Sequence, residues 1–196
     1  MINVVRADLA DSDVRRGISE IFAEGFAQWL VFFSKDPDRI AAAFAHMFVL
    51  DQFYVALYRG QVAGMAACTD GASLSVKLDK KELRKYLGYF KGTLAGIFLK
   101  KEFERTVHLS PSTGSIEFVG TAVEFRGQGV ASQLIRHILE HTPYETYLIE
   151  EVADTNIPAM KLYSKLGFKE YRRKQLPIKI ARKIGVNYMV SLKLCL

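Results

Sequence analysis

The sequence predicts an α/β domain in which about seven strands are flanked by helices. Short apolar runs with strand character alternate along the 196 residues with stretches whose apolar side chains recur every three or four positions. Hydrophobic residues make up 49% and charged residues 24% of the chain, a balance that indicates a buried core and excludes an intrinsically disordered protein. The length suits one domain, 1–196, with room for an insertion.

The first half of the chain is expected to form a strand, two helices and a hairpin. Ile2–Arg6 has the apolar character of a short strand, and residues 11–25 carry one apolar face at helical spacing. Asp36 followed by Pro37 is typical of a helix start, with a capping side chain and a proline in the first turn. Two apolar runs, on either side of Arg59 and Gly60, predict a β-hairpin over 53–68.

A long helical segment is predicted over residues 79–104. Three glycines four residues apart, Gly88, Gly92 and Gly96, lower helix stability by roughly 1 kcal/mol each, which indicates either close packing or a break into two helices. The basic residues of this segment are typical of a solvated helix face, or of a cover over a binding site. Its expected buried seam alternates steps of four and three residues and consists of Leu83, Leu87, Phe90, Leu94 and Ile97.

The second half is expected to alternate strands and helices. Strands are predicted at residues 115–123, 147–152, 168–173 and 187–194, and helices at 129–140 and 154–166. Gly167 suits the end of the second helix, where a residue in the left-handed conformation is common. The basic segment 174–183 is expected to join the last two strands.

Charge and cysteine content limit the partners and the setting. The net charge of +6 and the pI of about 9.3 favour anionic partners, whether phosphate groups, nucleic acid or anionic lipid.

Cys68 and Cys195 form no CxxC pair, so a disulfide framework is not expected and a reducing, cytoplasmic setting fits. The chain shows neither a signal-peptide pattern nor the roughly 18 uncharged apolar residues of a membrane span. His137 and His141 lack the pattern of a zinc site, and no metal is expected.

A glycine-rich turn lies between the strand at 115–123 and the helix at 129–140. A helix N-terminus offers free N–H groups to an anion, and glycines let a phosphate approach the backbone. The Lys-Ser/Thr pair of a P-loop is missing, and Ser132 stands where a dinucleotide-binding fingerprint needs glycine. The turn therefore indicates a phosphate-containing cofactor, with an incidental strand-to-helix turn as the alternative. It reads Arg126, Gly127, Gln128, Gly129, Val130 and Ala131, followed by Ser132.

A second pattern follows the strand at 147–152. Asp154 or Thr155 is expected to cap the next helix. Asn156, Ala159 and Tyr163 recur at helical spacing and share one face of that helix. On its own, Tyr163 would be interpreted as a core aromatic residue.

Taken together, the two patterns resemble the signature of the GNAT superfamily of N-acyltransferases, over about residues 115–171. The resemblance implies a mixed, mostly antiparallel sheet of about seven strands whose central parallel pair splays apart. It makes 78–111 a helical insertion, longer than the family's usual connection there, so the acceptor is not inherited from other members. The first motif is matched by Arg126, Gly129 and Ala131, and the second by Asn156, Ala159, Tyr163, Gly167 and Phe168.

The resemblance also implies acetyl-CoA (coenzyme A) as co-substrate, bound where the parallel strands separate. The backbone near Val123 and Phe125 would hold the pantetheine arm, and residues 126–132 would hold the pyrophosphate. Asn156 would fix the loop or a pantetheine amide through hydrogen bonds. Tyr163 would contact the cofactor as well.

In this family the acceptor amine attacks the thioester directly, which calls for a base for the ammonium and an acid for the departing thiolate. Tyr163 is the implied acid. Glu117 is the candidate base, because histone-acetylating members carry a glutamate in a similar place, and Glu150 and Glu151 on the next strand are rivals. Glu117 and Val123 share a face of an ideal strand, although a bulge would disturb this. A hydrogen-bonded or edge-exposed glutamate without a chemical role is the alternative.

The expected function is that of an N-acetyltransferase acting on a primary amine of a small molecule or peptide. The alternatives are a catalytically inactive acyl-CoA-binding regulatory module and a transferase acting on an aminoacyl-tRNA-type amine. Nucleic acid is not expected as a partner, because no aromatic-and-basic binding motif accompanies the positive charge; a homodimer is left open. The aromatic stretch 26–33 and the inserted helix are expected to flank the acceptor, with a buried core as the equal alternative.

Overall fold

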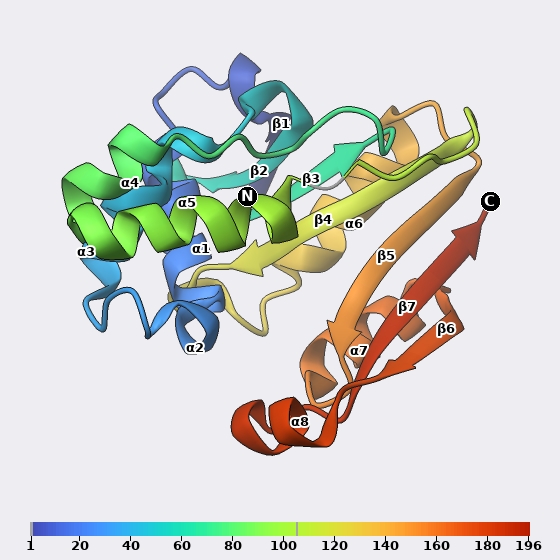
Figure 1. Ribbon diagram of the computed structural model, residues 1–196. Helices are drawn as coiled ribbons and strands as arrows, with labels where there is room; N and C mark the ends of the chain where they lie inside the picture. Colours follow the sequence, from blue (N-terminus) through green and yellow to red (C-terminus); the bar gives the residue numbers. More distant parts are fainter. Residues whose placement is uncertain (1, 105) are drawn as a thin grey trace.

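Seven strands form one mixed sheet in the computed structural model, which describes residues 2–104 and 106–196 without the side chains of Gln28 and Lys183. The sheet order is β1-β2-β3-β4-β5-β7-β6, and β4–β5 is the parallel pair, while the other neighbours run antiparallel (Figure 1). The predicted mixed, mostly antiparallel sheet with a central parallel pair is confirmed. The strands are β1 Ile2–Arg6, β2 Phe53–Tyr58, β3 Gln61–Thr69, β4 Thr113–Thr121, β5 Thr146–Ala153, β6 Lys169–Gln175 and β7 Tyr188–Cys195.

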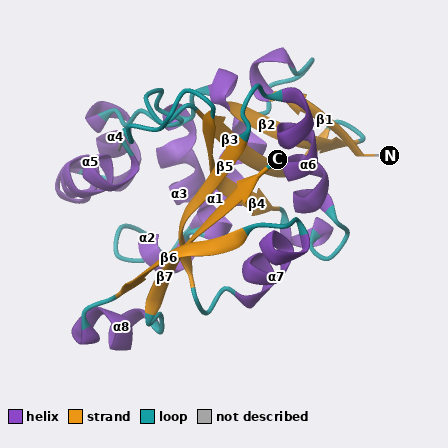
Figure 2. Ribbon diagram, turned by 90° about the vertical axis from the view of Figure 1, so that its right-hand side faces the viewer, coloured by secondary structure: helices purple, strands orange, loops and turns teal. Residues whose placement is uncertain are grey.

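Helices cover both faces of the sheet. The helices are α1 Arg15–Gly25, α2 Ala27–Leu30, α3 Pro37–Phe44, α4 Lys80–Leu87, α5 Tyr89–Phe103, α6 Val130–His141, α7 Ile157–Lys165 and α8 Ile178–Ile184. Short 3-10 turns are η1 Ala7–Leu9, η2 Ala45–Met47, η3 Leu50–Gln52 and η4 Val123–Phe125. Figure 2 shows α4 and α5 on one side of the sheet and α6 and α7 on the other. The side chains of the central strands are therefore packed between two layers of helix.

The parallel strands β4 and β5 separate soon after they begin. Thr113, Gly114 and Ser115 pair with the first residues of β5, and no pairing between the two strands is recorded beyond Ser115. A register shift interrupts β4 at Phe118, whose φ is 51°, and another interrupts β5 at Glu151, whose φ is 56°. Bulges bend a strand and increase its twist, so these two turn the strands away from each other, as Figure 1 shows. The predicted splay is confirmed.

The core on the α1 side of the sheet is built from aromatic rings around Phe22. Phe22 is fully buried and stacks on Phe26 with the ring centres 4.8 Å apart. Phe103, the last residue of α5, meets Phe22 at 6.0 Å and Phe118 of β4 at 5.7 Å. Such pairs contribute about 0.5–1.5 kcal/mol each beyond the burial of their area. The C-terminal end of α5 is thereby fixed over β4.

The predicted helical segment 79–104 is two helices, because Gly88 adopts a φ of 79° between α4 and α5. A Cβ on Gly92 would lie 2.6 Å from the Cα of Arg84, so the two helices pack closer than any other residue would allow. Both interpretations of the glycines, a break and close packing, are therefore correct. The predicted buried seam is correct for α4 and wrong for α5. Leu83 and Leu87 are buried, whereas the α5 members of the seam are exposed, because the turn at Gly88 re-aims the helix: Phe90 82%, Leu94 37% and Ile97 52%.

Three local expectations also need correction. The strand expected at 115–123 ends at Thr121, and Val123 lies in the 3-10 turn η4. The helix α7 is capped by Asn156, whose Oδ1 accepts a hydrogen bond from the Ala159 N–H at 3.3 Å, and not by Asp154 or Thr155. The basic connection after β6 contains the helix α8, which the sequence did not indicate. No helix in the described part of the chain is long and apolar enough to cross a bilayer.

Candidate functional site

The glycine-rich turn before α6 leaves an open anion site at the helix N-terminus. Gly127 and Gly129 have φ values of 75° and 80°, which glycine adopts without the steric cost of a side chain. A Cβ built on either glycine would meet no atom of the described part of the chain within 4 Å, so the space beside this backbone is free. Gly129 caps α6 without any side-chain hydrogen bond. Within residues 2–104 and 106–196, the N–H groups of Val130, Ala131 and Ser132 have no acceptor, so they are available to a phosphate.

Two side chains of the turn hold its shape. Arg126 Nε donates to the Thr121 carbonyl oxygen at 3.3 Å, and its Nη2 lies 3.9 Å from a carboxylate oxygen of Glu24. Gln128 Nε2 donates to the Glu124 carbonyl oxygen at 2.8 Å. The Arg126–Glu24 pair is about half exposed, and exposed pairs contribute little, so a phosphate can compete for the guanidinium.

The edge of β4 that faces β5 is open along its second half. Beyond Ser115 this edge has lost its neighbour, while the opposite edge stays paired with β3 through Glu117, Gly120 and Thr121. Unpaired backbone groups need a partner, and an extended ligand that carries amides supplies one. Sequence reasoning assigned this task to the backbone near Val123 and Phe125. The Val123 side chain is 52% exposed, whereas Phe125 is buried with its ring 5.5 Å from that of Tyr58, so the Phe125 side chain belongs to the core.

Glu117 lies on the α1 side of β4 and is held by two neutral hydroxyls. Thr69 Oγ1 donates to Glu117 Oε1 at 3.3 Å, and Ser75 Oγ donates to Oε2 at 2.6 Å. Thr69 and Ser75 are both buried, and Thr69 Oγ1 also accepts from the Gly71 N–H, which directs the hydroxyl proton at Glu117. The next residue, Phe118, is turned by the bulge so that its ring joins Phe103 and the α1 aromatics on the same side. Glu117 therefore lies beside these aromatic rings. The bulge at Phe118 interrupts the alternation of the strand between Glu117 and Val123, and Val123 lies beyond the strand in η4.

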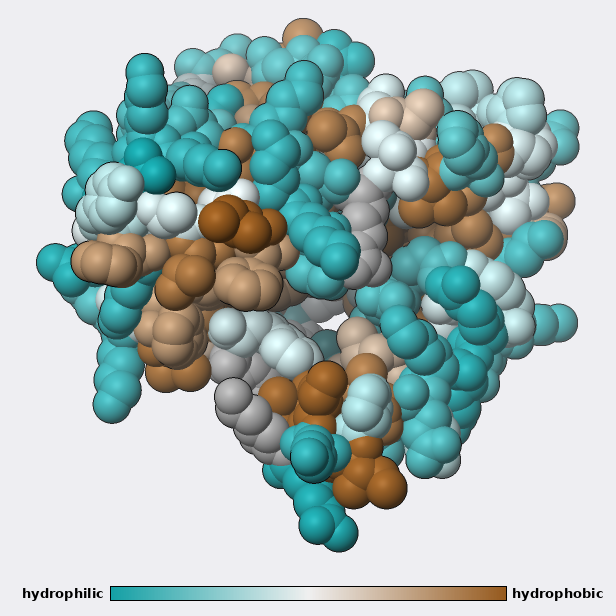
Figure 3. All heavy atoms as spheres, in the orientation of Figure 1, coloured by the Kyte–Doolittle hydropathy of each residue, from teal (hydrophilic) through white to brown (hydrophobic). Residues whose placement is uncertain are grey.

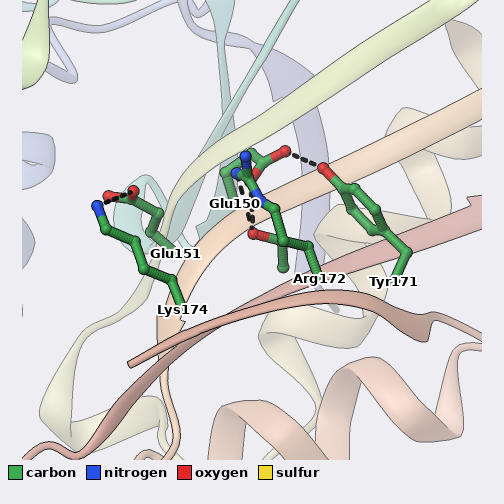
Figure 4. Close-up of polar contacts among 6 residues, drawn as sticks. Glu150, Glu151, Tyr171, Arg172 and Lys174 are labelled. Carbon is green, nitrogen blue, oxygen red and sulfur yellow. Dashed lines mark hydrogen bonds and ion pairs between the residues drawn. The ribbon is translucent and has the colours of Figure 1, made fainter. Parts of the chain in front are cut away.

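Glu150 and Glu151, the rival carboxylates on β5, have charged partners instead. Figure 4 shows Glu150 directed at Tyr171 and Arg172 of β6, while Glu151 points away toward Lys174. Glu150 accepts hydrogen bonds from the Tyr171 hydroxyl, from Arg172 and from the Ser191 hydroxyl of β7. Burial and then the bond to Glu150 raise the pKa of Tyr171 to about 12, so this hydroxyl remains a donor. Three donors occupy the Glu150 carboxylate, which thereby ties β5 to β6 and β7.

Tyr163 lies on the opposite side of the sheet from Glu117, in the core between α7 and β5. Its ring meets Phe168 edge-on at 6.1 Å, and only 5% of the residue is exposed. Burial raises the pKa of Tyr163 to about 12. Among the described residues its hydroxyl has no hydrogen-bond partner. The ring of Tyr163 thus packs in the core, while its protonated hydroxyl is without a hydrogen-bond partner among the described residues.

Sequence reasoning missed the residues that distinguish the candidate carboxylates. Ser75 lies in a loop with no motif, and it reaches Glu117 only because the chain folds back 42 positions along the sequence. Arg172 sits in the predicted strand β6, whose residues are all exposed, and no motif in the sequence marks it as a partner of Glu150. Cys68 is buried with its thiol pKa raised to about 12 by burial, so it is no nucleophile. The described residues contain no cluster of three or more metal-binding side chains.

Comparison with known proteins agrees with this geometry. The family model for the acetyltransferase (GNAT) family matches residues 18–168. No curated protein matches the chain. Solved structures with a similar fold include an N-acetyltransferase from Staphylococcus aureus Mu50, with a TM-score of 0.60 and 19% identity over 99% of this chain and 100% of that one. A GCN5-related N-acetyltransferase from Kribbella flavida gives a TM-score of 0.59 and 17% identity over 100% and 98% of the two chains. A putative acetyltransferase from Salmonella typhimurium, described with its cofactor acetyl-CoA, gives 0.57 and 16% over 99% and 93%.

Proposed function

This chain belongs to the GNAT acetyltransferase family, and from that premise we propose that it is an N-acetyltransferase, a single domain over 1–196 with a helical insertion at 78–111. It would transfer an acetyl group from acetyl-CoA to a primary amine of a small molecule or peptide. The observation that carries the proposal is the open anion site at the N-terminus of α6, next to the point where β4 and β5 separate. That combination offers a place for a pyrophosphate and, beside it, an unpaired strand edge for an amide-bearing arm.

The residues around the splay fit acetyl-CoA, which supplies an activated acyl group. The N–H groups of Val130, Ala131 and Ser132 would bind the pyrophosphate, and Arg126 would add a charged contact once it leaves Glu24. The open edge of β4, with the backbone that follows it up to Val123, would hold the pantetheine amides. Asn156 would keep the start of α7 in place, because its side-chain oxygen Oδ1 already caps that helix.

Glu117 is the proposed general base. A base must accept a proton from the amine. The partners of the Glu117 carboxylate are two neutral hydroxyls and not a cation that would compete with that proton. Thr69 and Ser75 would fix its orientation, because both hydroxyls donate to it and are themselves buried. Glu150 is the poorer candidate, because Arg172 and two hydroxyls already occupy its oxygens.

Tyr163 is the proposed donor to the departing sulfur. Its pKa of about 12 keeps the hydroxyl protonated at working pH, as a donor requires. An ordinary thiol has a pKa of about 8.5, so complete transfer from Tyr163 to a thiolate is uphill. The hydroxyl therefore acts best by hydrogen-bonding the sulfur as negative charge develops on it.

A thermal-shift experiment tests the cofactor and its site together. Acetyl-CoA at 100 times its dissociation constant adds about 2.7 kcal/mol if it binds only the folded chain, and NAD and ATP serve as ligand controls. Gly129→Ala would place a methyl group in the phosphate space and is expected to abolish the shift. Gly185→Ala is the matched control, because Gly185 also has a positive φ (69°) with no atom of the described residues within 4 Å of a Cβ, but ends α8.

The outcomes separate the candidate functions. A shift that Gly129→Ala alone removes, followed by amine-dependent release of free thiol, supports the acetyltransferase. A shift without thiol release from any amine would favour the catalytically inactive acyl-CoA-binding module. A shift that both variants keep would move the phosphate site elsewhere, and a shift with NAD instead of acetyl-CoA would overturn the proposal.

A further inference from the structure

The helix α5 exposes its large apolar side chains and buries its small ones. Gly92, Ala95 and Gly96 face the protein, where Gly96 would bring a Cβ within 2.7 Å of the Lys80 side chain. The solvent side carries Tyr89 68%, Phe90 82%, Leu94 37%, Ile97 52% and Phe98 63% exposed. A helix of a water-soluble protein normally shows the reverse pattern. The outer face of α5 is therefore built to be covered.

The apolar surface continues from α5 onto the segment around α2. Lys91 Nζ of α5 donates to the Phe33 carbonyl oxygen at 3.1 Å, which joins the two segments. Next to this contact, Trp29 is 39% and Phe32 64% exposed. These residues belong to the aromatic stretch that the sequence singled out, and Phe33 alone of these three is buried. We call the exposed apolar residues of the two segments the α5 patch: Trp29, Phe32, Tyr89, Phe90, Leu94, Ile97 and Phe98.

A second apolar prominence lies on α8. Ile178 is 65% and Ile180 is 47% exposed. Figure 2 shows α5 and α8 projecting on the same side of the sheet, away from α6 and α7. In Figure 3, apolar atoms gather over α5 and α2 at the left and again at the bottom, with a hollow between the two groups. The two prominences can therefore touch one flat surface at once.

Positive charge is concentrated in the two segments that carry these apolar residues. Residues 78–111 hold eight lysines and arginines against four carboxylates, and residues 169–184 hold seven against one, although Arg172 and Lys174 of the second segment pair with Glu150 and Glu151 of β5. The rest of the chain holds twelve against sixteen, so it is net acidic although the whole chain carries +6. Exposed apolar side chains within segments rich in lysine and arginine are a composition that binds anionic bilayers.

We propose that the α5 patch and the apolar residues of α8 form a docking surface for an anionic lipid bilayer. The aromatic and aliphatic side chains would enter the boundary between headgroups and acyl chains, and the surrounding cations would contact lipid phosphates. Trp29 has the size and polarity that favour this interfacial depth. A second copy of the chain fits less well, because two strongly basic faces would meet. The inference uses none of the residues proposed to bind acetyl-CoA or to move a proton.

Vesicle binding tests the proposal with a built-in reporter, because Trp29 is the only tryptophan of the chain. Vesicles of phosphatidylcholine with about one-third phosphatidylglycerol are expected to co-sediment the full chain, whereas pure phosphatidylcholine vesicles are not. Trp29 emission should shift to the blue with the anionic vesicles and be quenched by brominated lipid. High salt should weaken the binding.

Matched variants separate the apolar from the charged contribution. Phe90→Ser with Phe98→Ser is expected to weaken vesicle binding about tenfold or more, whereas Leu9→Ser, at a residue 67% exposed on η1, leaves it unchanged. Lys179→Gln with Arg182→Gln should weaken binding about fivefold for each charge removed. Arg136→Gln, on the exposed side of α6 across the sheet, is the charge control and should have little effect. All of these side chains are exposed, so the variants should keep the far-ultraviolet circular dichroism of the parent.

Three results would overturn the proposal. The first is the absence of both co-sedimentation and a Trp29 shift with the anionic vesicles. The second is vesicle binding that the control variants lose as readily as the patch variants. The third is a concentration-dependent dimer, without vesicle binding, that Phe90→Ser with Phe98→Ser abolishes; this would assign the face to a second copy. Because no acetyl-CoA enters these measurements, their failure leaves the proposed acetyl transfer untouched.

Discussion

A glutamate and a tyrosine lie near the separated strands in two places, Glu150 with Tyr171 and Glu117 with Tyr163. The two places differ in how many of the hydrogen-bonding atoms already have partners. Glu150 and Tyr171 bond to each other, and Arg172 and Ser191 occupy what remains of the carboxylate (Figure 4). Within the described residues, Glu117 has only two neutral donors and the Tyr163 hydroxyl has no partner. Side chains whose hydrogen-bonding atoms are all paired hold strands together. Side chains that still have unpaired hydrogen-bonding atoms can receive or donate a proton when a substrate arrives.

The difference teaches how to choose among carboxylates that sequence motifs cannot rank. All three glutamates lie in the two strands that separate, and Glu151 sits at the bulge itself with a φ of 56°. Backbone conformations of this kind cost of order 1–3 kcal/mol and gather at functional sites. Phe118 provides the corresponding outlier beside Glu117. The bulges mark the region, and the partners of each carboxylate decide its role.

The largest effect is expected from Glu117→Gln. A carboxamide cannot take up the ammonium proton, so kcat should fall about a hundredfold or more with little change in unfolding free energy. Glu150→Gln should behave in the opposite way. It should keep kcat within about threefold and lower the unfolding free energy by roughly 1–3 kcal/mol, because Arg172 loses its charged acceptor. Steady-state kinetics and urea unfolding of both variants check this contrast.

The control for this prediction is the pH–rate profile. The acidic limb of the profile should disappear in Glu117→Gln and persist in Glu150→Gln. An unchanged acidic limb in Glu117→Gln would remove Glu117 from the mechanism, whatever its kcat. A loss of activity in Glu150→Gln alone would reverse the two roles.

A smaller effect on turnover is expected from Tyr163→Phe. Loss of the donor to the departing sulfur should lower kcat by about tenfold to a hundredfold. Tyr171→Phe is the matched control, because Tyr171 has the same raised pKa of about 12 but already donates its hydroxyl hydrogen bond to Glu150. A kcat for Tyr163→Phe within about threefold of the parent would end the donor role. Equal losses in the two variants would point to a packing effect.

Much of the fold could be predicted from the sequence because local rules governed it. The proline and aspartate at the start of α3, the hairpin turn at Gly60 and the glycine after α7 each act through nearby backbone. The phosphate turn was predictable for the same reason, since Gly127 and Gly129 need positive φ and the helix follows at once. The family signature added the splay, which no periodicity in the sequence indicates.

The remainder depended on contacts between distant residues. The direction of α5 is set by one backbone angle at Gly88 and by packing on α4, so a pattern of apolar spacing assigned the wrong face to Phe90. The partners of Glu117 come from positions 69 and 75, and those of Glu150 come from β6 and β7. Such pairings follow from register and topology. A sequence without its fold cannot rank Glu117 above Glu150.

The smallest expected effect is on the unfolding free energy at alkaline pH, to which Tyr163 and Tyr171 should contribute differently. Burial raises the pKa of Tyr163 from about 10 to about 12, so above pH 10 the folded chain keeps a proton that the unfolded chain loses. Stability from this group is therefore complete below pH 10 and is lost as the pH rises toward 12. The loss amounts to at most ~2–3 kcal/mol for two pKa units. Tyr171 is nearly half exposed, so solvent screening should make its share smaller.

The different contributions of Tyr163 and Tyr171 to alkaline stability can be measured by urea unfolding at two pH values. One is neutral pH, and the other lies between the ordinary tyrosine pKa of about 10 and the folded value of about 12. Tyr163→Phe should flatten the alkaline decline of the unfolding free energy, because phenylalanine has no proton to lose. Tyr171→Phe should flatten it less. If Tyr163→Phe declined as steeply as the parent, its hydroxyl would titrate normally and the buried, protonated donor that distinguishes Tyr163 from Tyr171 would not exist.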